Sequence, residues 1–316
     1  MPEGLTEEVV ELLRSQPAVT NLVLLSGAAL QPSGDLVLCD VAREAASYVI
    51  GAVQDLVGAG RCAIAAEEID TSLSPGADQA ERAAPGSPVD AVVWEEVEAR
   101  TSEESSLSVT FLIMFVVAVL IAAIGVLLDS PVLIIGAMVV GPEFGPIAGF
   151  AVAIVERRAD VARKSLAALA VGFPVSILAS LVFVSVIRLL GPLPKSYTGG
   201  PGPLTAFISH PNWFSVIVAL LAGVAGMLSL TTTKSSVLVG VLISVTTVPA
   251  AANVGVAAAV GRWHECLGAA IQLAVNLASL LLAGVATLTI QRVVWHRWRR
   301  ISRAKAAQER HSLGRD

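Results

Sequence analysis

The chain has 316 residues, of which 54% are hydrophobic and only 15% are charged, with a formal net charge of −5. Soluble domains carry roughly 25% charged residues, so the composition excludes an ordinary soluble protein. Most of the charges lie in residues 1–106 and 292–316. Several apolar runs between them are about 20 residues long, enough to cross a ~30 Å hydrocarbon core. Because a backbone in lipid must satisfy its own hydrogen bonds, these runs are expected to be helices.

The termini and the cysteines restrict the partners and the cofactors. The acidic start lacks the basic segment of a secretory signal peptide. Cys39, Cys62 and Cys266 are scattered, which favours reduced thiols over disulfides or a metal site. We expect no cofactor. The acidic front half argues against a nucleic-acid partner, and the basic tail indicates contact with a lipid surface.

The first part of the chain, residues 1–72, has the pattern of a small soluble α+β domain. Alternating apolar residues and Gly/Pro turns predict a ββαβ set that fits a ferredoxin-like fold. Its elements are a helix at 7–13, strands at 21–25 and 35–39, a helix at 42–57 and a strand at 61–69.

Residues 73–106 are expected to connect this domain to the membrane. The Ser, Pro, Gly and Ala of residues 71–87 predict a linker, and residues 91–105 predict a charged amphipathic helix.

Residues 107–291 predict six transmembrane helices, and residues 292–316 predict a basic tail. Two helices contain helix-breaking residues: the second near Gly141-Pro142 and Gly145-Pro146, and the fifth near Pro249. The six expected helices span residues 107–128, 131–155, 165–190, 213–230, 236–260 and 267–290.

The distribution of basic residues predicts the orientation. Arginine and lysine gather between helices two and three, at residues 157–164, and in the tail. An even number of helices puts both groups on the side of the N-terminus. Cytoplasmic loops carry such an excess, so we expect both termini to be cytoplasmic, in a bacterial inner membrane.

The membrane region resembles itself at an offset of 101–105 residues. The stretch from Ala118 resembles the stretch from Ala219, and Pro146 falls near Pro249. Each repeat would hold three helices, so the halves would be inverted in the membrane. Paired broken helices in inverted halves are typical of a transporter's binding site. The alternative is a chance similarity between apolar helices of low complexity.

One motif resembles a known family. The stretch 129-DSPVLIIGAM-138, followed by Gly141-Pro142 and Gly145-Pro146, is similar to the signature of bacterial proteins with the domain of unknown function 389. The resemblance covers about residues 107–290. It implies an integral membrane protein without an established activity.

Glu143 is the only acidic residue deep in a predicted membrane helix. A charge there is costly and is usually functional. It can accept a proton or help to coordinate a cation. The alternative is a carboxyl group near a vestibule, or a protonated one in a helix contact.

Polar residues also surround the predicted break in helix five. Thr246, Thr247 and Asn253 flank Pro249, and hydroxyl and amide groups beside an unwound turn suit an ion or a polar solute. Hydrogen bonding between helices is an equally good interpretation. In the tail, Arg297, Arg299 and Arg300 are expected to contact anionic lipid headgroups.

The sequence therefore predicts a transporter or channel-like protein for a small ion or polar solute, including an anionic one. Its site would lie between broken helices two and five, at Gly141, Pro142, Glu143, Gly145, Pro146, Thr246, Thr247, Pro249 and Asn253. The alternative is a membrane-anchored sensor or scaffold whose N-terminal domain binds a ligand or partner. No catalytic set is visible, so an enzyme is not expected. Small-residue helix faces favour a homo-oligomer.

Overall fold

The structure is a computed structural model. It describes residues 3–58, 61–69, 74–84, 91–194, 197, 213–232 and 237–313. Side chains are described in these ranges except at residues 3, 237–246 and 295–313. Its contacts divide the chain into two units: Met1–Val97 with His296–Asp316, and Glu98–Trp295.

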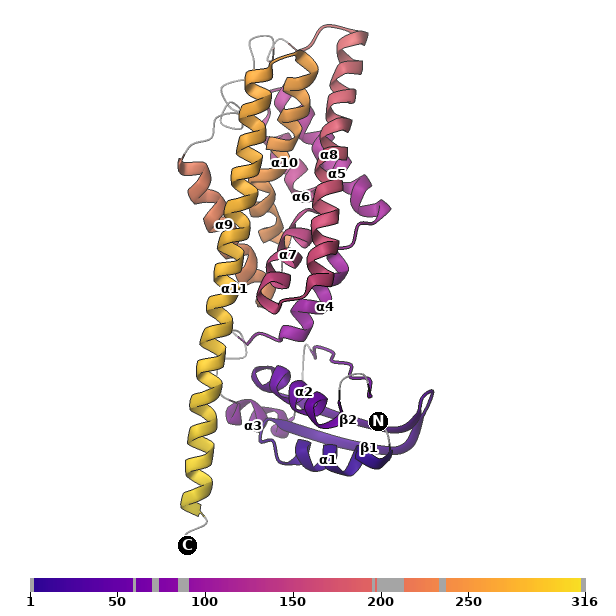
Figure 1. Ribbon diagram of the computed structural model, residues 1–316, viewed down its shortest axis with the longest axis vertical. Coiled ribbons are helices and arrows are strands. Elements are labelled where there is room, and N and C mark those ends of the chain that lie inside the picture. The colour runs from indigo at the N-terminus through magenta and orange to yellow at the C-terminus, as the bar shows by residue number, and fades with distance from the viewer. Residues whose placement is uncertain are drawn as a thin grey trace. The chain divides into compact units, whose positions relative to one another are not determined.

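The N-terminal unit is built on an antiparallel hairpin of β1 (Val19–Leu30) and β2 (Ser33–Val41). Helices α1 (Thr6–Arg14) and α2 (Arg43–Val57) pack against it (Figure 1). Apolar residues recur at helical spacing on both helices and form the core with the inward side chains of the strands. The buried helix residues of this core include Val9, Leu13, Val49, Val53 and Val57.

The ferredoxin-like prediction is wrong for the described residues, because they contain one sheet of only two strands. The segment 61–69, expected to be a third strand, has no regular structure. The segment contains three alanines and, just before Ile69, two glutamates, and both residue types are depleted in strands. Glu68 instead forms an ion pair with Arg43 at 2.7 Å.

The expected linker contains a helix, α3 (Pro75–Ala83), so that prediction is also wrong over these residues. Pro75 occupies a first-turn position, where its missing N–H costs nothing. Ala80 is buried. Gly76 lies so close to Thr20 that a Cβ atom there would be 2.6 Å from its hydroxyl oxygen. A composition typical of loops therefore forms a helix because β1 provides a surface for it.

The second unit is entirely helical in its described part and begins within α4 (Trp94–Glu104), near the expected amphipathic helix. The apolar helices that follow lie side by side (Figure 1). They are α5 (Val109–Leu127), α6 (Pro131–Val140), α7 (Phe144–Glu156), α8 (Ala159–Leu190), α9 (Trp213–Thr231), α10 (Val237–Val260) and α11 (Trp263–Leu313).

Several of these helices are long and apolar enough to cross a membrane. Among the described residues they are α5, α8, α9 and the Trp263–Val294 part of α11. The bent pair of α6 and α7 makes a fifth span if it is counted as one, and Thr247–Val260 of α10 is a shorter apolar helix. The helices thus indicate a multi-pass membrane protein.

Two predicted boundaries are wrong by several residues. Helix α8 begins at Ala159, not at residue 165, so Arg163 and Lys164 lie on its first turns. Helix α11 begins at Trp263 and continues through the expected tail to Leu313. In both places charged residues extend an apolar helix, because a helix leaving the hydrocarbon can carry them in water.

The predicted break in helix five is wrong. Helix α10 is continuous from Val237 to Val260, with Pro249 inside it. A proline removes one N–H and usually kinks a soluble helix, but membrane helices tolerate it because neighbouring groups satisfy the freed carbonyl. Pro174 inside α8 is a second example.

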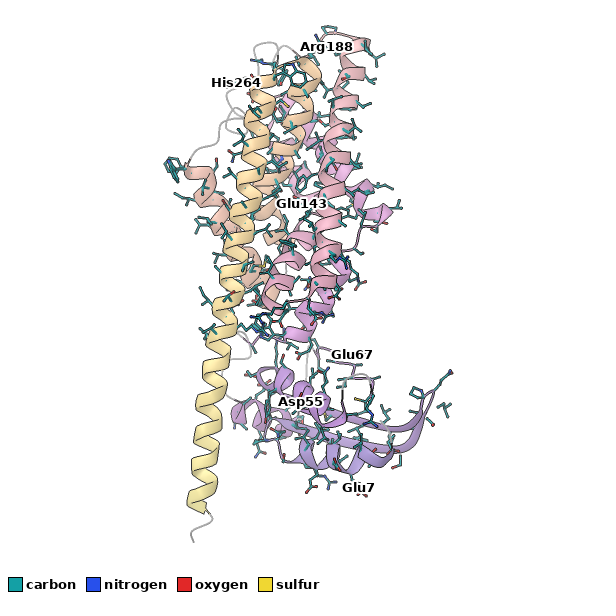
Figure 2. The ribbon with its side chains drawn as sticks, viewed as in Figure 1. Glu7, Asp55, Glu67, Glu143, Arg188 and His264 are labelled. Atoms are coloured by element: carbon teal, nitrogen blue, oxygen red, sulfur yellow. The ribbon has the colours of Figure 1, made fainter. Side chains whose placement is uncertain are left out.

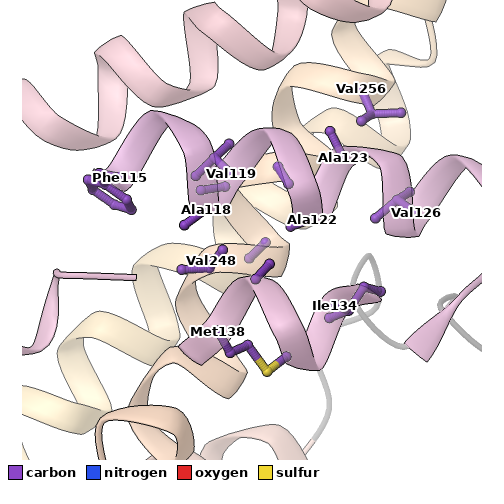
Figure 3. Packing of buried hydrophobic residues seen from close by; sticks show 14 of the residues in the cluster. Phe115, Ala118, Val119, Ala122, Ala123, Val126, Ile134, Met138, Val248 and Val256 are labelled. Carbon is purple, nitrogen blue, oxygen red and sulfur yellow. The ribbon is translucent and has the colours of Figure 1, made fainter. Parts of the chain in front are cut away.

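The centre of the bundle is an apolar cluster in which α5 packs against α6, α8 and α10. Small side chains dominate the α5 face, including Ala118, Ala122 and Ala123, which are fully buried (Figure 3). Small residues let helix backbones approach closely. The same cluster contains Met138 of α6 and Val248 of α10, so it brings the helix break near the middle of α10.

Candidate binding site at the helix break

The apolar segment after Pro131 consists of two helices whose axes are bent by 54°. Helix α6 ends at Val140 and α7 begins at Phe144. Pro142 has no N–H to continue the ladder of α6, and Pro146 is the third residue of α7, where an N–H has no partner within the helix. The two Gly-Pro pairs thus explain why one helix stops and another starts here.

Glu143 occupies the N-cap position of α7 and is 0% exposed. Figure 2 shows it part-way along the bundle, away from the end that carries Arg188 and His264. Its Oε1 accepts a hydrogen bond of 2.9 Å from the hydroxyl of Thr247 on α10. A helix N-terminus stabilises negative charge, so the position suits a carboxyl group that changes its protonation state.

Gly141 is needed for the space that this carboxyl group occupies. A Cβ atom at position 141 would lie 2.5 Å from Oε2 of Glu143 and 3.0 Å from a methyl group of Val248. The glycine before the break thus leaves room for the carboxylate between α6 and α10.

The remaining predicted site residues fall into two groups. Thr247, Pro249 and Asn253 are buried on α10, and Thr247 is hydrogen-bonded to Glu143. The side chain of Thr246 lies outside the described residues. On α7, Gly145 packs against the end of α4. A Cβ atom at position 145 would lie 2.8 Å from the carbonyl oxygen of Glu104.

Sequence reasoning missed Ser105, which follows α4 and is fully buried. Its hydroxyl donates a hydrogen bond of 3.2 Å to the carbonyl oxygen of Gly145. The interaction lies in the first turn of α7 and connects the residue after α4 to the start of that helix. The signal in the sequence is weak, because a serine between a charged helix and an apolar run is also an ordinary cap.

Polar side chains continue along α11. Gln272 and Asn276 are buried one turn apart and share a hydrogen bond of 2.9 Å. Gln291 donates to Thr231 of α9 at 2.8 Å. The contact between Gln272 and Asn276 is within one helix, so it leaves the interpretation as helix packing and the interpretation as a polar path both open.

The arginines predicted to bind lipid, Arg297, Arg299 and Arg300, are on the helical backbone of α11. Their side chains lie outside the described residues. In the part of the chain that the structure describes, no three His, Cys, Asp or Glu side chains gather as metal ligands would.

Residues 138–282 match the family model of the domain of unknown function DUF389. The family resemblance of the sequence is confirmed. The chain is also similar to an uncharacterized protein of Methanocaldococcus jannaschii, with 24% identity over 252 residues that cover 79% of this chain and 74% of the relative. No solved structure matches the chain. The DUF389 match includes the helix break and all of α10, so both sides of the contact between Glu143 and Thr247 lie inside it.

Proposed function

We propose that the chain moves a small ion or polar solute across the membrane and that Glu143 is the protonatable centre of its site. The observation that carries this proposal is a fully buried carboxyl group at the break between α6 and α7, hydrogen-bonded to Thr247 of α10. Buried acids in membrane helices are rare and mark ion or proton pathways. A helix that only anchors a protein needs neither the break nor the acid.

We propose six spans in two inverted repeats, an arrangement typical of transporters. The helix boundaries recur at an offset of 104 residues: α5 and α9 begin at Val109 and Trp213, and α8 and α11 begin at Ala159 and Trp263. The backbone caps recur as well. Arg157 ends α7 with a φ of 57°, and Gly261 ends α10 with a φ of 80°.

The same offset relates the two residues of the site. Glu143 and Thr247 are 104 positions apart, so in this register they are equivalent residues of the two halves. Equivalent residues touch each other only where they lie near the symmetry axis. The contact between Glu143 and Thr247 therefore fits a site on the pseudo-two-fold axis of an inverted repeat, which is where transporters of this construction bind their solutes.

The structure changes one part of the sequence-based hypothesis. Two broken helices would bring two half-helix N-termini together, and their partial positive charges would favour an anion. Because α10 is continuous, α7 alone contributes an N-terminus at the break. A carboxyl group and a hydroxyl suit a proton or a small cation better than an anion. We therefore propose that Glu143 binds a proton or a small cation.

The proposed orientation keeps both termini in the cytoplasm of a bacterial cell. Arg158 pairs with Glu98, and Arg292 pairs with Glu156 at 3.1 Å, so basic residues collect at the end of the bundle near α4. Arg188 and Arg262 are at the opposite end. The richer end is the cytoplasmic one by the usual bias. Anionic lipids at the tail and a homo-oligomer remain part of the proposal.

The alternative function is a sensor or scaffold held in the membrane by its helices. One observation favours it: Val23, Leu25, Leu36 and Leu38 of the hairpin are 42 to 50% exposed. Such an apolar surface fits a partner. A sensor or scaffold function gives no reason for a buried acid in the membrane unit, so transport is the better-supported function.

The test is flux through purified protein in liposomes. Vesicles loaded with a pH-sensitive dye are given a pH gradient, with sodium, potassium or chloride gradients in parallel, and the rate of internal pH change is recorded. We expect a protein-dependent rate that Glu143→Gln abolishes, because the amide keeps the shape and cannot exchange a proton.

Glu103→Gln is the matched control, since Glu103 is an exposed carboxyl group in the same unit. It should keep the full rate. Equal rates for all three proteins would remove Glu143 from the mechanism. Rates equal to empty liposomes under every gradient would favour the sensor or scaffold.

A further inference from the structure

The second feature of the membrane unit that points to a ligand is a pocket of about 450 Å³ at the end opposite α4. Its wall combines the C-terminal ends of α8 and α10 with the segment that follows α8. It is lined by Arg188, Gly191, Pro192, Leu193, Tyr197, Val260 and Arg262. None of these residues belongs to the site at Glu143.

The pocket carries one positive charge that no described carboxylate balances. Arg262 pairs with Glu265 at 2.7 Å. Arg188 has no ion pair among the described residues, and its Nη1 donates 3.1 Å to the carbonyl oxygen of Ala259 at the end of α10. That bond fixes one edge of the guanidinium group, while a guanidinium has further N–H donors in a planar fork. Such a fork matches phosphate and carboxylate oxygens.

Tyr197 adds a donor without a partner. The residue is 1% exposed, and its hydroxyl has no hydrogen-bond partner among the described residues. Leaving a buried hydroxyl unpaired costs about 1–3 kcal/mol, so the position is one that a bound acceptor stabilises. Burial and the nearby Glu265 carboxylate raise the pKa of the phenol to about 12. It therefore keeps its proton, and can donate it in a hydrogen bond, throughout the physiological pH range.

We propose that this pocket binds a phosphate group through Arg188, Arg262 and the hydroxyl of Tyr197. The three residues come from separate parts of the chain and line one cavity, which has a surplus of positive charge. The pocket lies at the ends of the apolar spans, which is the depth of phospholipid headgroups. The group can belong to such a headgroup or to a free phosphate ion. The proposal does not depend on transport at Glu143.

Two measurements distinguish the sources. In the first, full-length protein in neutral detergent is titrated with sodium phosphate at constant ionic strength, and the unfolding temperature is followed. In the second, protein in nanodiscs of mixed phosphatidylglycerol and phosphatidylcholine is extracted, and the retained lipid is identified by native mass spectrometry. Saturable stabilisation in the first assigns the site to the free ion, and retained phosphatidylglycerol assigns it to the lipid.

Arg188→Gln is the decisive variant, because Arg188 is exposed and its described hydrogen bond is with a carbonyl group. It should weaken the response on the order of tenfold, the loss expected from a charge-assisted hydrogen bond. Tyr197→Phe should weaken it to a lesser degree without loss of fold, since the ring is kept. Arg163→Gln, an exposed arginine of α8 near its other end, should respond as the unmodified protein does.

Three outcomes would overturn the assignment. The first is the absence of both phosphate stabilisation and retained phosphatidylglycerol. The second is an equal response to sodium acetate or sodium chloride, which would reduce the effect to general screening. The third is an unchanged response in Arg188→Gln. Because flux is not the readout, none of these outcomes bears on the role of Glu143.

Discussion

Ser105 and Gly149 fill one space: a Cβ atom at position 149 would overlap the hydroxyl of Ser105. Gly149 is one turn beyond Gly145, and both glycines face the segment that joins α4 to α5. The end of α4 is thus packed directly on the first two turns of α7. The N-terminal half of α7, which begins at Glu143, is held in place by this contact.

Gly149→Ala should therefore destabilise the membrane unit by about 1–3 kcal/mol, the usual cost of overpacking. The measurement is the unfolding temperature in detergent. In the double variant with Ser105→Gly, the hydroxyl and its Cβ are gone, so part of the loss should return as a coupling of ~1 kcal/mol. Additive losses in the two single variants and the double variant would mean that the two residues are not in contact.

Gly141→Ala should destabilise the protein because the new methyl group would meet the carboxyl group of Glu143. We expect a loss of about 1–3 kcal/mol and an altered flux in the liposome assay. Gly136→Ala, at a glycine inside the preceding helix α6, is the control, since nothing lies within 4 Å of a Cβ atom there. Equal effects of the two substitutions would show that the space for Glu143 does not decide the result.

Thr247→Val should lower stability by about 1–3 kcal/mol, because a buried carboxyl group then loses a donor. Thr247→Ser keeps the hydroxyl and should lose less. Repeating both substitutions with Glu143→Gln tests the pair directly, since the cost of Thr247→Val should change when its partner is altered. An unchanged cost in the Gln background would contradict the hydrogen bond.

The sequence predicts two of the membrane helices closely. Helix α5 was expected at 107–128 and spans Val109–Leu127, and α9 was expected at 213–230 and spans Trp213–Thr231. It fails at α10, because a single proline in lipid does not end a helix. It also fails at residues 61–69, where the alternation is too weak a strand signal because Ile64 and Ile69 are the only β-branched residues of the segment.

The candidate site could be predicted only in part. Glu143 is visible in the sequence because a carboxyl group in an apolar run is unusual. Its hydrogen bond with Thr247 is not, since 104 positions separate the two residues and their contact depends on how α6, α7 and α10 pack. The role of Ser105 depends in the same way on the packing of α4 against Gly145.

The hydrogen bonds of Asp35 lead us to expect that the hairpin loses protection from hydrogen exchange at acid pH. Its carboxylate accepts hydrogen bonds from Thr6 at 2.7 Å and from the backbone of Gly27 at 2.8 Å. The Thr6 bond first, and then the Gly27 bond, lower the pKa of Asp35 below its ordinary value of 3.8. A group with a lowered pKa stabilises the fold above that ordinary value, and the stabilisation disappears as the pH falls through the folded-state pKa.

We therefore expect hydrogen exchange of β1 and β2 in the full-length protein, corrected for intrinsic rates, to lose protection below about pH 4. Asp35→Asn should be less protected at pH 6 and should show a smaller change on acidification. Asp55→Asn, at an exposed position of α2, is the control and should follow the unmodified protein. The same acid-dependent loss in Asp35→Asn would assign it to another group.

The proposed orientation predicts which end of the bundle is accessible from outside the cell. In a background with Cys39, Cys62 and Cys266 replaced by alanine, a single cysteine is placed by Gly191→Cys or by Lys164→Cys. Gly191 follows α8 in an extended conformation with nothing within 4 Å of a Cβ atom, and Lys164 is exposed on the second turn of the same helix. The two positions are thus matched for access but lie at opposite ends of one apolar span.

Because Lys164 belongs to the end with more basic residues, a membrane-impermeant maleimide should label Gly191→Cys in intact cells and leave Lys164→Cys unlabelled. Both should react once the membrane is permeabilised, which controls for access. Labelling of Lys164→Cys alone in intact cells would reverse the orientation, and with it the side from which the phosphate pocket near Arg188 is reached.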